Sequence, residues 1–246
     1  MRVVLLGATQ GMGRALARRL AARGETIALL GRSRRDLERS ARDLELRGAR
    51  SPVATAECDL EQPEGFERAL DSIEDQIGVF DTVVVSAALF ASQAELEEDP
   101  ELTRRLLDLD FTATVLFCEA ARRRLLERGG GGTLCVFGSV AGDRGRKPVV
   151  LYGAAKAGLA AYLEGLDHRY HARGLRVVCV KPGFVRTAMT AELKPPPFAG
   201  EPDAVAARVL RAIDRSTPVI YAPAPWRALM GVIRLLPRAV MRRVDF

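Results

Sequence analysis

The sequence is poor in the residues that form metal centres and disulfide frameworks. Its four cysteines, Cys58, Cys118, Cys135 and Cys179, are widely spaced, and each lies in or beside an apolar segment. Because metal sites usually need closely spaced ligand pairs, we predict four reduced thiols and no metal site. The chain also has only two histidines. Both fall on one helix face without a ligand motif, and we interpret them as a solvated surface.

Long hydrophobic runs are missing as well. No uninterrupted apolar stretch is long enough to cross a bilayer, and the start Met1-Arg2-Val3 lacks the charged region of a signal peptide. We therefore expect a cytoplasmic protein. A chain of 246 residues with 48% hydrophobic content can bury a full core, and no linker or repeat divides it. We predict a single domain over residues 1–246.

Acidic residues are outnumbered, with 31 against 37 lysines and arginines, which gives a net charge of +6. A basic protein can bind nucleic acid, anionic lipid or phosphorylated substrates. Aromatic residues are scarce at 6%, and no nucleic-acid motif occurs. We therefore expect no nucleic-acid partner. Much of the arginine could equally be a solvated surface.

Three residues in the second half of the chain carry a candidate catalytic site. Tyr152 and Lys156 are four apart, so on a helix the ammonium sits beneath the phenol and favours the phenolate. Ser139 follows the apolar run 133–137, a predicted strand, at the edge where open α/β sheets bind ligands. Ser139 can then orient a carbonyl while Tyr152 protonates its oxygen. A Tyr–Lys pair also arises by chance, so this prediction needs a dinucleotide site beside it.

A glycine-rich loop near the amino terminus supplies that context. The apolar strand 2–6 leads into Gly7-Ala8-Thr9-Gln10-Gly11-Met12-Gly13, and a helical pattern starts at Arg14. Glycines permit a tight turn and let a pyrophosphate approach backbone N–H groups at a helix N-terminus. The Gly-x3-Gly-x-Gly spacing differs from the common dinucleotide fingerprint. We predict a dinucleotide-binding loop.

Together the loop, Ser139, Tyr152 and Lys156 resemble the short-chain dehydrogenase/reductase family over nearly the whole chain. The resemblance implies a Rossmann-type, doubly wound α/β domain with a mostly parallel seven-stranded sheet, in a homodimer or homotetramer. It also implies that NADPH delivers hydride to a ketone and that Tyr152 donates the proton. Lys156 would lower the phenol's pKa and hold the nicotinamide ribose, and Ser139 would bind the oxygen.

The predicted second strand, 26–30, ends in Gly31-Arg32, so it lacks the acid that bonds the ribose 2′-hydroxyl of NAD. An arginine there accommodates a 2′-phosphate. In the family this pattern, with Arg14, implies NADPH/NADP+. Arg34 and Arg35 could instead simply begin a charged helix. The cofactor-binding residues assigned by the loop and the resemblance are Gly7, Thr9, Gln10, Gly11, Met12, Gly13, Arg14, Arg32, Asp59, Leu60, Ser86, Ala87, Tyr152, Lys156, Pro182, Gly183, Val185 and Thr187.

The chain departs from the family pattern at two places. Ser86-Ala87 stands within the motif where the family has Asn-Asn-Ala-Gly, and Asp110 stands where it generally has a catalytic Asn that helps hold a water. A carboxylate can also hold water, but it partly offsets the charge of Lys156 and so weakens the lowering of the Tyr152 pKa. We expect Asp110 either to keep this relay with altered pH dependence or to lie slightly displaced from it.

Three further segments concern the substrate. The cations of segment 143–148 fit an anionic substrate at the entrance, or belong to an exposed loop. The Pro-rich segment 187–200 is a predicted substrate-covering loop. The tail 225–246 has an apolar stripe with arginines, interrupted at Pro237. That pattern is typical of an interfacial helix and equally of packing over the pocket or in a subunit interface.

The C-terminal part is also similar to bacterial decaprenylphosphoryl-2-keto-erythropentose reductases. That similarity implies a lipid-linked keto substrate and peripheral contact with the inner face of the membrane. Two alternatives stay open. One is a soluble carbonyl reductase without membrane contact. The other is a noncatalytic NADP(H)-sensing or scaffold protein, which the departures at Ser86 and Asp110 motivate.

Overall fold

The computed structural model describes residues 1–127 and 130–245, apart from the side chain of Ser51. Its centre is a seven-stranded sheet in the order β3-β2-β1-β4-β5-β6-β7, and every neighbouring pair is parallel. The predicted Rossmann-type sheet is therefore confirmed. The strands are β1 (Arg2–Leu6), β2 (Thr26–Gly31), β3 (Arg50–Glu57), β4 (Thr82–Val85), β5 (Gly132–Phe137), β6 (Leu175–Pro182) and β7 (Val219–Ala222).

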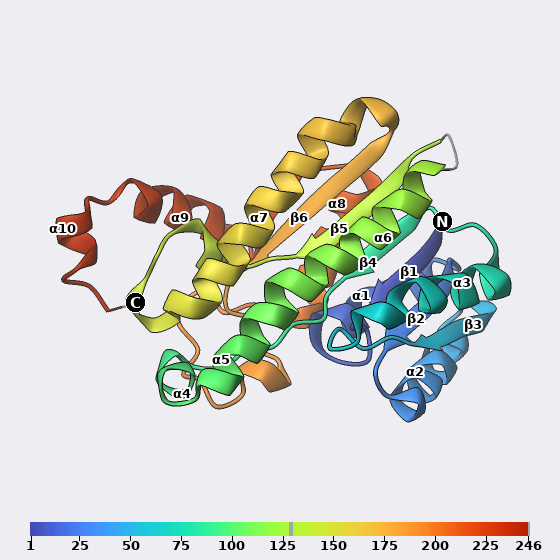
Figure 1. The fold of residues 1–246 in the computed structure, drawn as a ribbon, viewed down its shortest axis with the longest axis horizontal. Coiled ribbons are helices and arrows are strands. Elements are labelled where there is room, and N and C mark those ends of the chain that lie inside the picture. Colours follow the sequence, from blue (N-terminus) through green and yellow to red (C-terminus); the bar gives the residue numbers. More distant parts are fainter. Residues whose placement is uncertain (128–129, 246) are drawn as a thin grey trace.

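Helices cover both faces of the sheet, so the central strands are buried on both sides and read as continuous apolar runs (Figure 1). In β1, Val3 and Leu5 join the core on one face, and Val4 and Leu6 join the core on the other. The first face is covered by α1 (Gly11–Ala22), α2 (Arg34–Leu46) and α8 (Pro202–Asp214), and the second by α3 (Phe66–Ile77), α6 (Thr114–Glu127) and α7 (Val150–Tyr170).

The order of the strands places a ligand crevice. The chain moves outward from β1 to β2 and β3, and then returns to pair β4 with the other side of β1. Ligands of open α/β sheets bind where the strand order reverses, outside the carboxyl ends of the strands. The turn after β1 and the turn after β4 therefore line the same crevice.

The helical segment that begins at Pro100 is divided into three pieces. Helix α5 (Pro100–Leu107) passes into a π-helical turn, η2 (Asp108–Ala113), and then into α6. Such turns contain one extra residue per hydrogen-bonded ring and often occur at functional sites. The turn changes which side chains face inward, and Asp110 is fully buried in it.

Short helices complete the described chain. These are α4 (Gln93–Glu98), η1 (Pro63–Gly65), η3 (Val140–Asp143), η4 (Lys147–Val149), η5 (His171–Arg173) and η6 (Ala188–Thr190).

Two helices form the C-terminal tail. Helix α9 (Pro225–Leu235) is followed by α10 (Arg238–Met241), and Pro237 separates them as predicted. In Figure 1 both project from one end of the molecule, away from the sheet. The last residue of the predicted tail, Phe246, lies outside the described residues. Within the described ranges, no helix is both long and apolar enough to cross a membrane.

Candidate active site

The three predicted catalytic residues come together beyond the end of β5. Ser139 follows β5 after one glycine, and Tyr152 and Lys156 lie one turn apart on α7. The Lys156 Nζ is 5.5 Å from the centroid of the Tyr152 ring. The Ser139 hydroxyl interacts with the phenol, which lowers the Tyr152 pKa. The geometry therefore supports a serine-assisted tyrosine acid above a buried ammonium.

Burial has the largest effect on the Tyr152 phenol and raises its pKa above the ordinary value. The charge of Lys156 and the Ser139 hydroxyl act in the opposite direction, and Asp110 adds to the rise. Lys156 thus lowers the pKa of Tyr152, as predicted. Burial nevertheless keeps this pKa above the ordinary value, so the phenol is protonated at neutral pH. A protonated phenol is the form that can donate a proton to a carbonyl oxygen.

Asp110 lies beside Lys156, one of the three predicted catalytic residues. Its Oδ2 is 3.2 Å from the Lys156 Nζ, and its Oδ1 accepts a hydrogen bond of 2.8 Å from the Leu89 N–H. The two side chains are 0% and 1% exposed. Burial is the largest single effect on Lys156 and lowers its pKa, but Asp110 and Tyr152 together raise that pKa above the ordinary value, so Lys156 is held charged. Burial also raises the pKa of Asp110, against the effect of Lys156.

Phe90 is an active-site neighbour that the sequence analysis missed. Its ring meets the Tyr152 ring edge to face, with centroids 5.2 Å apart. Leu89 and Leu151 belong to the same apolar cluster as Tyr152. No motif marks Phe90; only its position after the β4 turn, which faces the crevice, could have indicated it. An apolar wall beside the Tyr152 phenol excludes water from it.

A cavity of about 250 Å³ lies at the carboxyl ends of β1, β2 and β4. It is lined by most of the predicted cofactor residues: Gly7, Thr9, Gln10, Gly11, Met12, Gly13, Arg32, Asp59, Leu60, Ser86, Ala87 and Thr187. Lining residues that the sequence analysis did not assign to the cofactor include Gly31, Cys58, Glu61, Arg105, Leu109 and Met189. The missed residues come from segments whose approach to the crevice depends on the tertiary structure.

Two glycines show that this cavity is built for close contact with backbone. Gly7 has φ +91°, and a Cβ there would lie 2.4 Å from the Ala87 nitrogen. A Cβ on Gly13 would lie 2.5 Å from the Gly7 carbonyl oxygen and 2.3 Å from the Ser86 Oγ. The glycines therefore let the loop pack closely on the β4 turn, which brings the start of α1 to the cavity, where a helix N-terminus can hold a pyrophosphate. The residues present fit a dinucleotide.

Ser86 supplies hydrogen bonds at the position where the chain departs from the family motif. Its hydroxyl lies 3.2 Å from the carbonyl oxygens of both Leu6 and Gly7 and donates to this pair. It thereby ties the β4 turn to the glycine loop. A shorter Ser side chain in place of the family's Asn thus still supplies a hydrogen bond at this position.

The two arginines predicted for a 2′-phosphate are placed differently. Arg32 is exposed and lines the cavity at the end of β2. Arg14 does not line it; its guanidinium is 3.8 Å from Asp43 on α2. The following arginine, Arg34, pairs with Glu57 at 2.9 Å. Arg32 is therefore the lining arginine at this end of the site.

The segment after β6 is only partly in the cavity. Thr187 lines it, whereas Pro182 and Val185 are buried. A Cβ on Gly183 would lie 2.2 Å from the Trp226 ring, so this glycine is needed for packing of the tail. Within this motif, Thr187 thus lines the crevice, and Gly183 makes room for the Trp226 ring of the tail.

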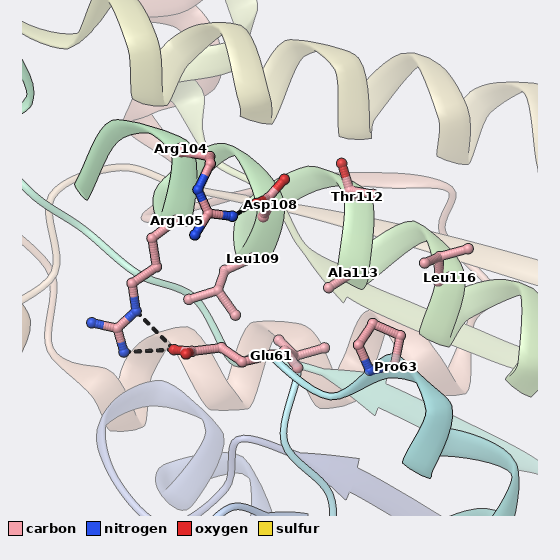
Figure 2. A pocket seen from close by; sticks show the side chains of 10 residues that line it. Glu61, Pro63, Arg104, Arg105, Asp108, Leu109, Thr112, Ala113 and Leu116 are labelled. Carbon is pink, nitrogen blue, oxygen red and sulfur yellow. Dashed lines mark hydrogen bonds and ion pairs between the residues drawn. The ribbon is translucent and has the colours of Figure 1, made fainter. Parts of the chain in front are cut away.

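A second cavity of about 310 Å³ adjoins the first and shares Leu60, Glu61, Arg105 and Leu109 with it. Figure 2 shows Arg105 reaching from α5 across to Glu61. Its Nε and Nη2 atoms both donate to the Glu61 Oε1. This ion pair lines both cavities.

The cations predicted at the substrate entrance are largely engaged by the protein itself. Arg144 donates to the Leu236 carbonyl at 2.9 Å, and Lys147 pairs with Asp245 at 2.7 Å. Both contacts hold the tail against the segment between Ser139 and Tyr152. Among the described residues, no group of three or more His, Cys, Asp or Glu side chains could hold a metal ion, and all four cysteines are free and buried.

A glycine turn at the strand-order reversal, with a serine, tyrosine and lysine beside it, defines a dinucleotide-dependent oxidoreductase of the Rossmann type. The chain belongs to the short-chain dehydrogenase family, whose model matches residues 1–197. The matched segment contains every residue of the candidate site.

Known relatives agree with this assignment. The chain is 35% identical to an uncharacterized oxidoreductase of Mycobacterium tuberculosis, Rv2073c, over 98% of this chain and 96% of the relative. An uncharacterized oxidoreductase of Streptomyces coelicolor is 33% identical, with coverage of 98% and 95%. Carbonyl reductase family member 4 of Xenopus laevis is 28% identical, with coverage of 84% and 88%.

Solved structures share the fold. A short-chain type dehydrogenase/reductase from Mycobacterium ulcerans superimposes with a TM-score of 0.80 and 25% identity, covering 90% of this chain and 88% of that one. A second, from Mycobacterium marinum, gives a TM-score of 0.79 and 26% identity, with coverage of 89% and 93%.

Proposed function

We propose that this protein is an NADPH-dependent reductase that converts a ketone of a hydrophobic or lipid-linked substrate into a secondary alcohol. The observation that carries the proposal is the arrangement of the buried Tyr152 phenol, which interacts with the Ser139 hydroxyl and lies 5.5 Å, measured from its ring centroid, from the Lys156 Nζ. When bound, NADPH supplies the hydride. The substrate oxygen would accept a hydrogen bond from Ser139 and the proton from Tyr152, and Lys156 would stabilise the phenolate that remains.

Arg32 supports the preference for NADPH. It is exposed at the end of β2, where Gly31 replaces the acid that an NAD site uses. A guanidinium matches a 2′-phosphate in charge and geometry. Support for a ketone comes from the similarity to carbonyl reductase family member 4. Support for a hydrophobic substrate comes from Phe90 and from Met189, which is 46% exposed at the mouth of the site.

The decisive variant is Tyr152→Phe, which removes the proton donor and keeps the ring. NADPH oxidation should be measured across a panel of small ketones and a polyprenyl-phosphate 2-keto pentose. We expect Tyr152→Phe to lose at least about 100-fold in kcat, because a positioned acid contributes about that much or more, while NADPH fluorescence still reports binding. Tyr170→Phe, at the far end of α7, is the matched control and should retain full activity.

The same experiment separates the alternatives. Turnover of small ketones only would support a soluble carbonyl reductase. If the parent protein binds NADPH but turns over no ketone of the panel, the reductase proposal fails for these substrates and the sensing role gains support. Equal rates for Tyr152→Phe and the parent would exclude Tyr152 as the acid.

A further inference from the structure

The C-terminal helix pair, α9 and α10, carries an apolar surface that nothing in the described chain covers. Helix α9 has two apolar sides. Trp226, Met230 and Ile233 are buried and pack against Val140. Leu229, Val232 and Leu235, spaced three residues apart, lie 38%, 62% and 85% exposed along another side.

This exposed stripe, Leu229, Val232 and Leu235, is continued on α10 by Val240, which is 41% exposed. In Figure 1 both helices project beyond the end of the sheet. A soluble helix that only packed on its own domain would carry polar residues on its second side.

The charge of the same segment is strongly positive. The exposed arginines of the tail are Arg227, Arg234, Arg238, Arg242 and Arg243. None of them forms an ion pair with another described residue, whereas the single acid of the tail, Asp245, is already paired with Lys147. An unneutralised cluster of this kind is attracted to an anionic surface.

These observations distinguish between possible partners. If two copies met through this surface, both arginine clusters would be brought together without acids to compensate them, which costs free energy. An anionic bilayer accepts both features, because its headgroups neutralise the arginines and its acyl region buries the exposed stripe. We propose that α9 and α10 bind the surface of an anionic lipid bilayer.

The attachment of α9 links this surface to the active site. Val140, which packs against α9, directly follows Ser139, and the Arg144 guanidinium holds the carbonyl of Leu236 at the end of α9. Trp226 Nε1 donates to the Phe198 carbonyl at 3.2 Å, which fixes the predicted substrate loop to the same helix. Binding through α9 therefore holds the substrate loop and the serine segment next to the lipid surface.

Flotation of the full protein with vesicles tests the proposal without substrate or cofactor, so its result is independent of the reductase activity. We expect the protein to float with vesicles of phosphatidylcholine and 30% phosphatidylglycerol, and far less with phosphatidylcholine alone. Raising the salt concentration should weaken binding, because exposed charges are screened. Leu235→Glu should lower the vesicle partition coefficient at least tenfold.

Leu46→Glu is the matched control, because Leu46 is 90% exposed on α2, far along the chain from the tail. It should float like the parent protein. A second pair tests the charge: Arg238→Glu with Arg242→Glu should release the protein, whereas Arg39→Glu with Arg42→Glu on α2 should not.

Three results would overturn the proposal. The first is that the parent stays unbound on anionic vesicles at low salt, and the second is that Leu46→Glu and Leu235→Glu lose binding equally. The third is that Leu235→Glu converts a dimer into monomers in light scattering without changing flotation, which would assign the surface to a second copy. Circular dichroism of each variant confirms that it is folded.

Discussion

The buried pair of Asp110 and Lys156 gives this active site a charge balance different from that of an enzyme with asparagine at position 110. Asp110 raises the pKa of Lys156 and also that of Tyr152. The negative charge of Asp110 thus partly cancels the positive charge of Lys156 beneath the phenol. The hydrogen bond that Asp110 accepts from Leu89 shows that the residue also fixes the turn after β4.

Asp110→Asn should move the alkaline limit of activity to lower pH. The amide can still accept from the Leu89 N–H, but without the carboxylate the pKa of Tyr152 falls, so the acid form is lost earlier as pH rises. The measurement is kcat/KM for ketone reduction against pH. Asp108→Asn, on the exposed side of the same turn, is the control and should leave the profile in place. An unchanged profile for Asp110→Asn would exclude this electrostatic role.

Arg32 is the residue on which the cofactor preference is proposed to depend. Arg32→Ser should raise the KM for NADPH about tenfold or more, because a charge-assisted contact contributes about 1.5–3 kcal/mol, and should leave the KM for NADH nearly unchanged. Arg35→Ser, three residues along and exposed, serves as the control. If Arg32→Ser raises the KM for NADPH and the KM for NADH equally, Arg32 does not recognise the 2′-phosphate.

Among the larger elements, α3 and α6 are joined by two arginines that differ in their number of partners. The Arg124 guanidinium, 12% exposed, reaches Glu67, Asp71 and Glu74 at 2.7–2.8 Å. The neighbouring Arg123 pairs with Glu67 alone and is 51% exposed. The two arginines therefore offer a direct comparison of a networked and a surface ion pair.

Arg124→Met should lower the free energy of unfolding by about 2 kcal/mol, because three charged acceptors lose their donor. Arg123→Met should cost less than about 0.5 kcal/mol. Both are measured by urea denaturation at pH 7. The pKa of Glu67 is lowered by Arg124 and Arg123, so this contribution is present at neutral pH and is lost as pH falls below the ordinary glutamate range. Equal losses for the two variants would contradict the network.

For the molecule as a whole, the tail is part of the folded domain through its buried side. Trp226 is 8% exposed, packs with Val140 and Met230, and lies against Gly183 at the end of β6. The tail thus packs against the segments that follow β5 and β6. The exposed side of the tail is the surface that we propose binds a lipid bilayer.

Trp226→Ala should cost about 3 kcal/mol, since burying a large aromatic side chain contributes this much, and should lower Tm by about 6–12 °C. Ketone reduction should fall as well, because Val140 next to Ser139 loses its support. Leu235→Ala on the exposed side of α9 is the control, with a change in Tm of less than about 2 °C. A parent-like Tm for Trp226→Ala would show that the tail is not part of the cooperative unit.

The sequence alone determined the features that depend on local chemistry. Apolar runs predicted individual strands, glycines predicted the turn after β1, and the spacing of Tyr152 and Lys156 placed them on one helix face. Pro237 predicted the break in the tail. Each of these signals acts within a few residues, so it can be read without knowledge of the fold.

Only the tertiary structure decided which distant residues meet. The π-helical turn that buries Asp110 against Lys156, the edge-to-face contact of Phe90 with Tyr152, and the diversion of Arg14 to Asp43 all depend on packing between elements. The same holds for the tail, whose hydrophobic pattern could not show which side is buried. Long-range packing sets these contacts, and no local pattern encodes the position of a partner far along the chain.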